Sequence, residues 1–377
     1  MNITFFSNFL NSHQLPMALA FDAMDNVNYT FISLMETDHL LGRESLDRDY
    51  AFVLREYESE QQKMDAMRHA LEDEVVVFGD MSGKEQYVKA RAGTGKHFFR
   101  YSERLLKRGD WWRFVPPKIY RTWNWFGRYK NANMHVLCAS AYTARDLELF
   151  GFPREKCLKW GYFPDAAICE ASHIALPGYK TLCSAQRLIP WKRVDMQLRL
   201  AYRLKQEGYA FRLRIAGDGP ERVRLEKMAH DLGVTECVEF LGELTHDETI
   251  ELMRDSEIFL ATSNRMEGWG ATVNEAMASG CCVVASDAMG SVPYLIENGV
   301  TGIIYRDGED GDLFSRTALL FDGEVDVRFI SSNAVIRLRD VWGASSAARA
   351  LYNMCVFNRL PGSEDAGLNS NLPLSLA

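Results

Sequence analysis

The sequence predicts an α/β protein built from two doubly wound parallel-sheet domains, and three observations lead to this prediction. The chain has 377 residues, which is more than a single hydrophobic core usually holds. Short apolar runs alternate with amphipathic stretches of helical period along most of its length. Glycines follow several of the expected helices, as is typical of helix ends with a left-handed residue. Strand and helix alternating at this spacing favour a parallel sheet.

In the first half, the expected strands are buried apolar runs that end in turn residues. They cover residues 3–9, 29–34, 74–78 and 135–139. A polar turn at 11–16 leads from the first strand into a helix that reaches about residue 24, and a second helix is expected at 141–150. These elements predict an N-terminal domain over residues 1–170.

The second half begins where periodicity fades and Pro164 and Pro177 appear, which predicts an interdomain connection. A regular repeat follows, with expected strands at 181–188, 211–216, 238–241, 258–262, 281–286 and 302–305. Its expected helices lie at 194–206, 221–232, 246–255, 272–279 and 293–297. The repeat predicts a C-terminal domain over 171–342. A helix at about 343–360 is expected to pack back on the N-terminal domain, and 361–377 to be a disordered tail.

Composition favours a cytoplasmic protein. The eight cysteines form no CxxC pair and no regular framework, which is typical of reduced core residues. The first residues contain no cationic segment before a short apolar run, so no signal peptide is expected. No stretch of eighteen apolar residues occurs, so no membrane-spanning helix is expected either.

The most informative segment is 267–280, where a loop with two glycines follows an expected strand and enters an expected helix. Backbone N–H groups and the positive helix end at such a place suit a diphosphate. Glu267 lies in the loop and Glu275 in the first helical turn, so the two carboxylates can reach different parts of one extended ligand. The alternatives are a capping box between Thr272 and Glu275, and a merely solvated charge at Glu267.

A second group of candidates follows the first two strands of the C-terminal domain. Arg187 and Lys192 combine a planar guanidinium with a compact ammonium, which suits a bridging diphosphate. Their alternative is a surface loop near a helix start. The turn from Gly217 to Pro220 ends in a proline at a helix start. The GxGxxG fingerprint of dinucleotide-binding dehydrogenases is missing.

In this order, these motifs resemble the C-terminal domain of glycosyltransferase family 4 over about residues 182–305. The resemblance rests on Arg187, Lys192, the turn 217–220, Phe240-Leu241-Gly242, the segment 267–280, Val283-Val284-Ala285 and Gly290. It implies the GT-B architecture, in which two Rossmann-like domains face each other across a cleft. It also implies a retaining, hexosyltransferase-type enzyme. Such an enzyme moves a sugar from a nucleotide-sugar donor to a glycan or lipid-linked acceptor, in cell-surface polysaccharide or glycolipid synthesis.

The resemblance assigns roles to individual residues. Arg187 and Lys192 would hold the donor diphosphate and stabilise the leaving nucleotide. Glu275 would accept hydrogen bonds from the ribose, and Glu267 would bind hydroxyls of the donor sugar. Further donor-binding candidates are Gly217, Asp218, Gly219, Leu241, Gly270, Ala271 and Thr272. Because the leaving phosphate assists deprotonation of the acceptor in such enzymes, no protein nucleophile is assigned. Two cations and a helix dipole offset the phosphate charge, so neither a metal nor another cofactor is expected.

The acceptor side departs from the family pattern. Family members often carry a glycine-rich loop after the first strand, whereas this chain has Asn11-Ser12-His13-Gln14. His13 and Gln14 are candidates for a cross-cleft contact, although a histidine in a turn is more often structural or solvated. Glu103 and Arg104 are candidates for the acceptor site.

Residues 84–130 carry thirteen Lys/Arg and three acidic residues, a net charge of +10 in a chain whose total is −8. Twelve aromatic residues are interleaved with these cations. Cations and amphipathic rings suit an anionic membrane surface, which predicts peripheral attachment to the inner face of the cell membrane. Nucleic acid is not expected as a partner, because the remainder of the chain is acidic. The alternative is a partly buried surface with solvated charges.

Two other functions remain open. A sugar-nucleotide epimerase of related fold would bind the same donor without an acceptor, and product analysis with labelled donor separates it from a transferase. A non-enzymatic, membrane-associated binding module would show neither transfer nor donor hydrolysis. Retention of all four donor-site candidates (Arg187, Lys192, Glu267 and Glu275) favours the transferase.

Overall fold

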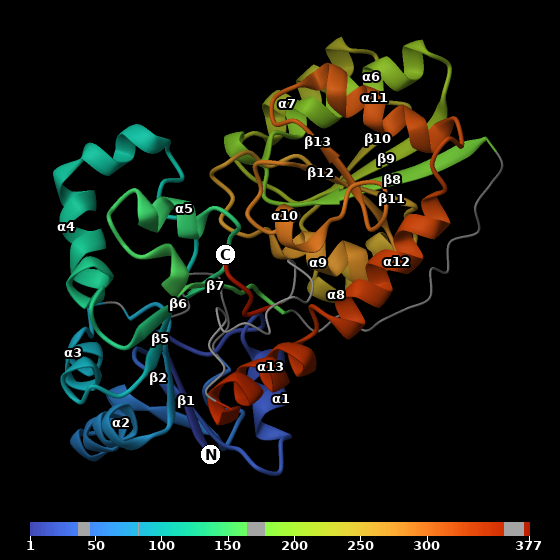
Figure 1. The fold of residues 1–377 in the computed structure, drawn as a ribbon. Helices are drawn as coiled ribbons and strands as arrows, with labels where there is room; N and C mark the ends of the chain where they lie inside the picture. Colours follow the sequence, from blue (N-terminus) through green and yellow to red (C-terminus); the bar gives the residue numbers. More distant parts are fainter. Residues whose placement is uncertain (37–45, 82, 164–177, 358–372) are drawn as a thin grey trace. The chain divides into compact units, whose positions relative to one another are not determined.

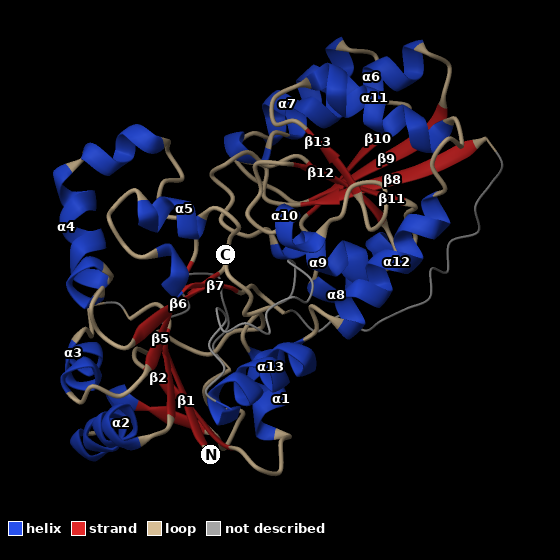
Figure 2. Ribbon diagram, in the orientation of Figure 1, coloured by secondary structure: helices blue, strands red, loops and turns tan. Residues whose placement is uncertain are grey.

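The computed structural model describes residues 1–36, 46–81, 83–163, 178–357 and 373–377. The chain forms two compact units: unit 1 comprises Met1–Asp165 and Gly343–Ala377, and unit 2 comprises Ala166–Trp342. Each unit has a parallel sheet with helices on its faces (Figures 1 and 2). The predicted fold class, two Rossmann-like doubly wound domains, is confirmed.

The sheet of unit 1 has seven parallel strands in the order β3-β2-β1-β4-β5-β6-β7. They are β1 (Asn2–Ser7), β2 (Asn28–Ser33), β3 (Val53–Arg55), β4 (Val75–Phe78), β5 (Phe98–Ser102), β6 (Met134–Cys138) and β7 (Cys157–Lys159). Four of these were predicted, while β3, β5 and β7 were not. The strand order reverses between β1 and β4, so the loops that follow these two strands lie at the topological switch point.

The helices of unit 1 cover its sheet and include one from the end of the chain. They are α1 (Leu15–Asp22), α2 (Glu60–Glu72), α3 (Gln86–Gly93), α4 (Pro116–Trp125), α5 (Thr143–Glu148) and α13 (Ala344–Phe357). Short 3-10 turns occur at η2 (Glu56–Glu58), η3 (Asp110–Phe114), η4 (Gly127–Tyr129) and η5 (Arg154–Lys156). Helix α13, red in Figure 1, packs against the blue α1, so sequence ends far apart meet within unit 1.

The last five residues form an ordered strand-like partner for β7. The backbone N–H of Lys159 donates to Ser375 O at 2.8 Å, and Leu374 N donates to Lys159 O at 2.7 Å. Leu158 and Leu376 form an antiparallel bridge. The prediction of a disordered tail is therefore wrong for 373–377, because this segment supplies hydrogen-bond partners to an edge strand that would otherwise be open. Residues 361–372 of the predicted tail lie outside the described residues.

Unit 2 has a six-stranded parallel sheet in the order β10-β9-β8-β11-β12-β13. Its strands are β8 (Tyr179–Ala185), β9 (Ala210–Ala216), β10 (Val238–Gly242), β11 (Ile258–Ala261), β12 (Cys282–Ser286) and β13 (Ile303–Tyr305). All six were predicted, although β8 ends at Ala185, three residues earlier than expected. The order reverses between β8 and β11, which places the switch point between these two neighbouring strands.

Seven helices surround the sheet in the described part of unit 2. They are α6 (Val194–Gln206), α7 (Arg222–Asp231), α8 (His246–Arg254), α9 (Ala271–Ala278), α10 (Val292–Leu295), α11 (Asp310–Phe321) and α12 (Val327–Asp340), with a 3-10 turn η6 (Pro190–Lys192). The sequence predicted the first five, and α11 and α12 were not predicted. Helices on both sides of the sheet bury continuous apolar strands such as β11 and β12, as parallel sheets require.

A histidine pair lies at the amino ends of β5 and β6 in the unit 1 sheet, and the pKa values of the two rings lead to a testable prediction. His97 Nε2 and His135 Nδ1 lie 2.8 Å apart. Burial, and for His97 also the neighbouring ring of His135, lowers the pKa of His97 to about 3, and burial lowers that of His135 to about 4. Both rings therefore stay neutral in the folded state at pH values where an unfolded chain, with a His pKa of about 6.5, takes up protons.

We expect the free energy of unfolding to fall as the pH decreases from about 6.5 to 4.5. Each ring contributes up to about 1.4 kcal/mol per pH unit in this window, because protons bind the unfolded state first. Urea titrations at several pH values measure this slope. Since carboxylates also titrate near pH 4, the matched control is His97→Gln, which should have a visibly shallower slope. Equal slopes in the two proteins would contradict the prediction.

Candidate functional site

The candidate site in unit 2 starts from two loops at the switch point: residues 186–193 after β8 and residues 262–270 after β11. Hydrogen bonds join the two loops. Thr262 Oγ1 donates to Lys192 O at 2.9 Å, and Asn264 N donates to Trp191 O at 2.9 Å. Gln197 on α6 donates to the same Thr262 hydroxyl at 2.9 Å. The backbone that carries Lys192 is therefore held in place from two sides.

The side chains of two predicted site residues meet across these loops. Lys192 Nζ donates to a carboxylate oxygen of Glu267, and the two form an ion pair although 75 positions separate them. Each side chain is 17% exposed, so solvent reaches the pair and a ligand can do the same. Arg187, in the first of the two loops, is exposed and makes no hydrogen bond or ion pair to the described residues. One of the three charges in this group is thus available to an anion.

A third loop, which follows β9, packs against the first so tightly that its glycines are required. A Cβ atom on Gly217 would lie 1.9 Å from Gln186 O, and one on Gly219 would lie 2.5 Å from Leu188 O. Both glycines also have positive φ angles, of 121° and 157°. Asp218 is used within the loop, because one carboxylate oxygen accepts from Gly219 N at 2.6 Å and the other pairs with Arg222 on α7. The loop thus fixes the course of the backbone around Arg187.

The neighbouring strand β10 ends beside this loop. Gly217 N donates to Gly242 O at 2.6 Å, and the pairing of β10 with β9 shifts register between Phe240 and Gly242. Leu241 lies within this irregular stretch. The structure therefore brings the predicted residues 217–219 and Leu241 to one edge of the sheet, next to the loop that carries Arg187.

Helix α9 begins at this edge, with Gly270 as its N-cap at φ 92°. Ala271 and Thr272 are the first two helical residues, so their N–H groups lie in the unsatisfied first turn. A Cβ on Gly270 would lie 2.5 Å from the flexible Met289 Cε, and the positive φ of this residue favours glycine. The preceding Trp269 is buried, and its indole N–H donates to Asn274 Oδ1 at 2.9 Å. The approach to the helix N-terminus is therefore rigid.

Glu275 does not form the capping box that was the alternative to a binding role. Thr272 lies inside α9 rather than at its N-cap, and the N-cap makes no side-chain hydrogen bond. Glu275 is only 5% exposed, and its carboxylate has no hydrogen-bond partner among the residues that the structure describes. A capping box is present instead at the start of α8, between Thr245 and Glu248.

The electrostatics of Glu275 suit a carboxylate that accepts a hydrogen bond from a bound ligand. Burial raises its pKa, and the nearby His246 lowers it by a smaller amount. A buried carboxylate without a donor is costly, and a ligand hydroxyl would offset that cost. His246, at the first position of α8, was not predicted as a site residue. Its place directly after the loop that follows β10 was the signal in the sequence that pointed to it.

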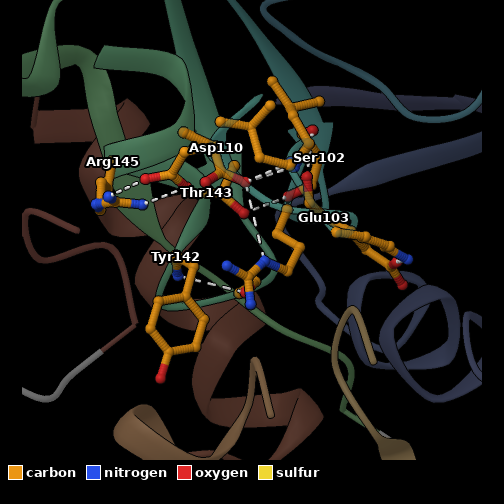
Figure 3. Close-up of polar contacts among 12 residues, drawn as sticks. Ser102, Glu103, Asp110, Tyr142, Thr143 and Arg145 are labelled. Atoms are coloured by element: carbon orange, nitrogen blue, oxygen red, sulfur yellow. Dashed lines mark hydrogen bonds and ion pairs between the residues drawn. The ribbon is translucent and has the colours of Figure 1, made fainter. Parts of the chain in front are cut away.

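In unit 1, side chains that follow β1, β5 and β7 come together around Glu103, which is labelled in Figure 3. Tyr162 OH donates to Glu103 Oε1 at 2.9 Å, and Lys107 Nζ donates to Glu103 Oε2 at 2.6 Å. The ring of His13 lies edge-on to the ring of Tyr162, with 6.1 Å between centroids. The structure therefore brings the predicted residues His13 and Glu103 together through Tyr162. Sequence reasoning missed Tyr162 because it lies where periodicity fades.

The other two acceptor-side candidates are engaged in the fold. Arg104 is buried over the ring of Tyr142, at 4.4 Å, and its Nε lies 3.9 Å from the buried carboxylate of Asp146. That carboxylate also accepts from Leu105 N and Leu106 N at 2.8 Å each, so it fixes the loop after β5. Gln14 precedes α1 and donates to Ser7 Oγ at 3.0 Å. These contacts favour structural roles for Arg104 and Gln14.

The basic aromatic stretch divides into buried and exposed cations. Arg91 is buried and donates to four backbone carbonyls, those of Ala70, Asp73, Glu74 and His97. Arg100 is buried as well and forms two hydrogen bonds with Glu85, each of 3.0 Å. These two positive charges are therefore buried inside unit 1 and cannot contribute to membrane binding.

The exposed part lies on η3 and α4, where large apolar side chains face solvent. We call Trp111, Phe114, Ile119, Tyr120 and Trp123 the aromatic surface. Four guanidinium groups lie over rings of this region: Arg108 over Trp112, Arg113 over Phe114, Arg121 over Trp125 and Arg128 over Trp123. Such an arrangement of cations and rings is typical of proteins that meet an anionic interface.

The described residues contain neither a candidate membrane span nor a candidate metal cluster. Across 1–36, 46–81, 83–163, 178–357 and 373–377, no helix is both long and apolar enough to cross a bilayer. In the same ranges, no three His, Cys, Asp or Glu side chains are grouped so that they could hold a metal ion.

Comparison with known proteins finds similarity over most of unit 2. Residues 171–333 match the model of the family "Glycosyl transferases group 1". The amylovoran biosynthesis glycosyltransferase AmsK of Erwinia amylovora is 31% identical over 151 residues, which cover 39% of this chain and 37% of AmsK. The putative colanic acid biosynthesis glycosyltransferase WcaL of Salmonella typhimurium is 29% identical over 189 residues, 48% of this chain and 46% of WcaL. The chain thus matches less than half the length of either relative.

Solved structures show the same fold over almost the whole chain. HepE of Anabaena in complex with UDP superposes with a TM-score of 0.69, at 15% identity, over 95% of this chain and 100% of HepE. The lipopolysaccharide outer core galactosyltransferase WaaB superposes with a TM-score of 0.67, at 18% identity, over 95% of this chain and 99% of WaaB. The fold is the GT-B fold of these structures, and residues 171–333 match the glycosyl transferases group 1 model.

Proposed function

We propose that the chain is a retaining, metal-independent, hexosyltransferase-type glycosyltransferase of family 4. It transfers a sugar from a nucleotide-sugar donor to a glycan or lipid-linked acceptor in the synthesis of cell-surface polysaccharide or glycolipid. The observation that carries this proposal is the buried carboxylate of Glu275 in α9, which has no hydrogen-bond partner among the described residues, together with the ion pair of Lys192 and Glu267. The matched relatives act in amylovoran and colanic acid biosynthesis, and HepE binds UDP and UDP-glucose, which supports it.

The donor is proposed to lie along the carboxyl edge of the unit 2 sheet. Its diphosphate meets the exposed guanidinium of Arg187 and the first N–H groups of α9. The ribose hydroxyls donate to Glu275, which supplies the hydrogen bonds that its carboxylate lacks in the protein alone. Glu267 accepts from hydroxyls of the sugar while Lys192, held against it, faces the phosphate. The same cations stabilise the charge that develops on the leaving nucleotide.

The acceptor is proposed to bind unit 1 through Glu103. One carboxylate oxygen is held by Tyr162 and the other by Lys107, which leaves lone pairs on both oxygens for an acceptor hydroxyl. Tyr162 and Lys107 fix the orientation of this carboxylate. The leaving phosphate takes the acceptor proton, so no protein nucleophile is needed.

A thermal-shift panel of UDP, GDP, ADP and dTDP sugars tests the donor site. A ligand that binds only the folded state stabilises it by mass action and so raises the unfolding midpoint. At a ligand concentration of one hundred times Kd, the free energy of unfolding rises by about 2.7 kcal/mol. We expect one base to give a clear shift in the parent chain and a much smaller one in Glu275→Gln. Labelled donor with candidate acceptors then separates transfer from epimerisation. If no nucleotide sugar shifts the midpoint and none is consumed, the chain is a binding module without this activity.

We also propose that the chain attaches peripherally to the inner face of the cell membrane through the aromatic surface and the guanidinium groups over it. Each well-placed Lys or Arg near an anionic surface contributes about 1 kcal/mol, and exposed charges are screened over about 8 Å at physiological ionic strength. Binding to anionic vesicles should therefore weaken as salt rises, while the contribution of the exposed rings persists.

Vesicle co-sedimentation at low and high salt measures this attachment. We expect Arg108→Gln with Arg113→Gln to lower the bound fraction several-fold at low salt. The control is Lys89→Gln with Lys227→Gln, which removes the same charge from exposed positions on α3 and α7 that are not part of the aromatic surface. Equal losses in the two double variants would mean that net charge, rather than this surface, governs binding.

A further inference from the structure

Unit 1 contains an open pocket of about 80 Å³ between α4 and the segment that follows α5. Its floor is buried and apolar and includes Phe126, Leu147 and Phe152, while the exposed side chains of Ile119 and Trp123 form its rim. This volume is well below that of a typical small-molecule site, so the pocket holds part of a chain or one ring rather than a whole lipid. None of the residues proposed above to bind donor or acceptor lines it.

Polar groups stand in a row on the same helix beside this pocket. Lys118 and Thr122 are four residues apart on α4, so they share one face of the helix, and Phe126 follows four residues later. Thr122 is 3% exposed and lines the pocket, yet its hydroxyl oxygen has no hydrogen-bond partner. Successive turns of α4 therefore present a cation, an unsatisfied hydroxyl and an apolar ring.

Lys118 behaves as a cation without an adjacent anion. No hydrogen bond or ion pair joins its ammonium to another described residue, and its side chain is only partly exposed. Burial, together with repulsion from Arg121 and Lys107, lowers the pKa of Lys118 to about 8, and Asp146 offsets this only in part. A bound anion between Lys118 and Arg121 would stabilise the charged ammonium.

The surroundings identify the chemistry of the occupant. Arg128 lies 5.5 Å from the ring of Trp123 at the rim, and the neighbouring Tyr120 is exposed. Cations and exposed rings that surround an apolar pocket complement a molecule with an anionic head and a hydrocarbon chain. A soluble anion would leave the pocket empty, and a neutral hydrocarbon would leave Lys118 without a partner.

We propose that this pocket binds one molecule of an anionic glycerophospholipid. The phosphate lies between Lys118 and Arg121, and the ester carbonyl one turn further along accepts a hydrogen bond from Thr122. One acyl chain enters the pocket over Phe126 and Leu147, and the second stays at the exposed rim beside Trp123. This site goes beyond the proposed function, because it is a discrete lipid site that serves neither donor nor acceptor and that differs from adsorption on a charged surface.

Titration calorimetry of the full chain with dihexanoyl phosphatidylglycerol, kept below the concentration at which it forms micelles, tests the site without a membrane. We expect saturable binding of one molecule per chain. Glycerol phosphate has the same phosphate without acyl chains, and dihexanoyl phosphatidylcholine has the chains with a zwitterionic head. Both should bind at least tenfold more weakly. Absence of saturable phosphatidylglycerol binding, or equal binding of glycerol phosphate, would overturn the proposal.

Variants distinguish the parts of the site. Lys118→Gln with Arg121→Gln should weaken phosphatidylglycerol binding about tenfold or more, and Ile119→Ala with Trp123→Ala should do the same from the pocket side. Thr122→Val keeps the shape of the side chain and removes a hydroxyl that has no hydrogen-bond partner among the described residues, so the variant should fold normally. It should bind phosphatidylglycerol about twofold to tenfold more weakly. Lys89→Gln with Lys227→Gln is the charge-matched control and should bind like the parent.

The readouts separate this site from the proposed function. The thermal shift given by the nucleotide sugar should be unchanged in all three pocket variants, because their positions are outside the donor site. If the control double variant weakens phosphatidylglycerol binding as much as Lys118→Gln with Arg121→Gln does, the lipid responds to net charge alone and the discrete site is refuted, whatever the outcome of the donor experiments.

Discussion

Replacement of Arg187 with alanine is expected to lower turnover by about 10²–10³ while the protein remains fully folded. Removing one preorganised group that stabilises transition-state charge typically has an effect of this size. The fold should not change, because Arg187 is exposed and makes no contact with the described residues that its loss would break. The loop around it is held instead by the backbone and by Gly217 and Gly219. This separation of activity from stability makes Arg187 the sharpest test of the donor site.

Steady-state turnover measures the effect, with the nucleotide sugar that gives the largest thermal shift as donor. The unfolding midpoint is the second readout. Arg224→Ala is the matched control, because Arg224 is an exposed arginine on α7 that pairs only with a surface carboxylate. Lys192→Ala should lose as much activity, but it also leaves Glu267 without its cation and is therefore harder to interpret. Parent-like turnover in Arg187→Ala would remove this residue from the diphosphate site.

Glu275→Gln is expected to lower turnover about tenfold to a hundredfold and, at the same time, to raise the unfolding midpoint at pH 7. The loss of activity reflects weaker hydrogen bonds to the ribose, since bonds to a charged group are worth about 1.5–3 kcal/mol. The gain in stability follows from linkage. Burial raises the pKa of Glu275 in the folded state, so its contribution is most favourable at low pH and is lost as the pH rises above the unfolded value near 4.5.

Glutamine carries no charge at any pH, so the variant should be more stable than the parent at pH 7 and nearly equal to it at pH 4. Calorimetric midpoints at both pH values measure this. Glu248→Gln provides the opposite signature, because Glu248 is exposed and its carboxylate completes the capping box of α8. That variant should lose a little stability and keep full turnover. Lower stability together with full turnover in Glu275→Gln would show that this carboxylate has a structural role instead of a role in donor binding.

In the described part of unit 2, all six strands and five of the seven helices could be predicted from sequence, because strands such as β11 and β12 are uninterrupted apolar runs and several helices end in glycine. Unit 1 could be predicted less well, and β5 shows why. Its sequence, Phe98-Phe99-Arg100-Tyr101-Ser102, has a cation in the middle that argued against a buried strand. The structure buries Arg100 nonetheless, because Glu85 and the ring of Trp125 neutralise and cover it. A charge whose partner lies elsewhere in the sequence cannot be recognised from local pattern alone.

The candidate site shows the same difference between motifs within one short segment, which could be predicted, and contacts between distant segments, which could not. The helix start at α9 and its two carboxylates were visible in one short segment, so the donor side was predicted from pattern and resemblance. The ion pair of Lys192 with Glu267 spans 75 positions, and the link between His13 and Glu103 depends on Tyr162 from a third part of the chain. Side chains that become neighbours only through strand order require the topology of the sheet to be known first.

The discontinuity of unit 1 also has a consequence for synthesis on the ribosome. All of unit 2, Ala166–Trp342, is translated before α13 and the segment that pairs with β7 exist. Unit 2 can therefore fold cotranslationally as a continuous stretch, whereas unit 1 exposes the α1 face and the β7 edge until α13 and residues 373–377 have left the exit tunnel. A nascent chain arrested after residue 342 should thus present a folded second half and an incomplete, protease-sensitive first half.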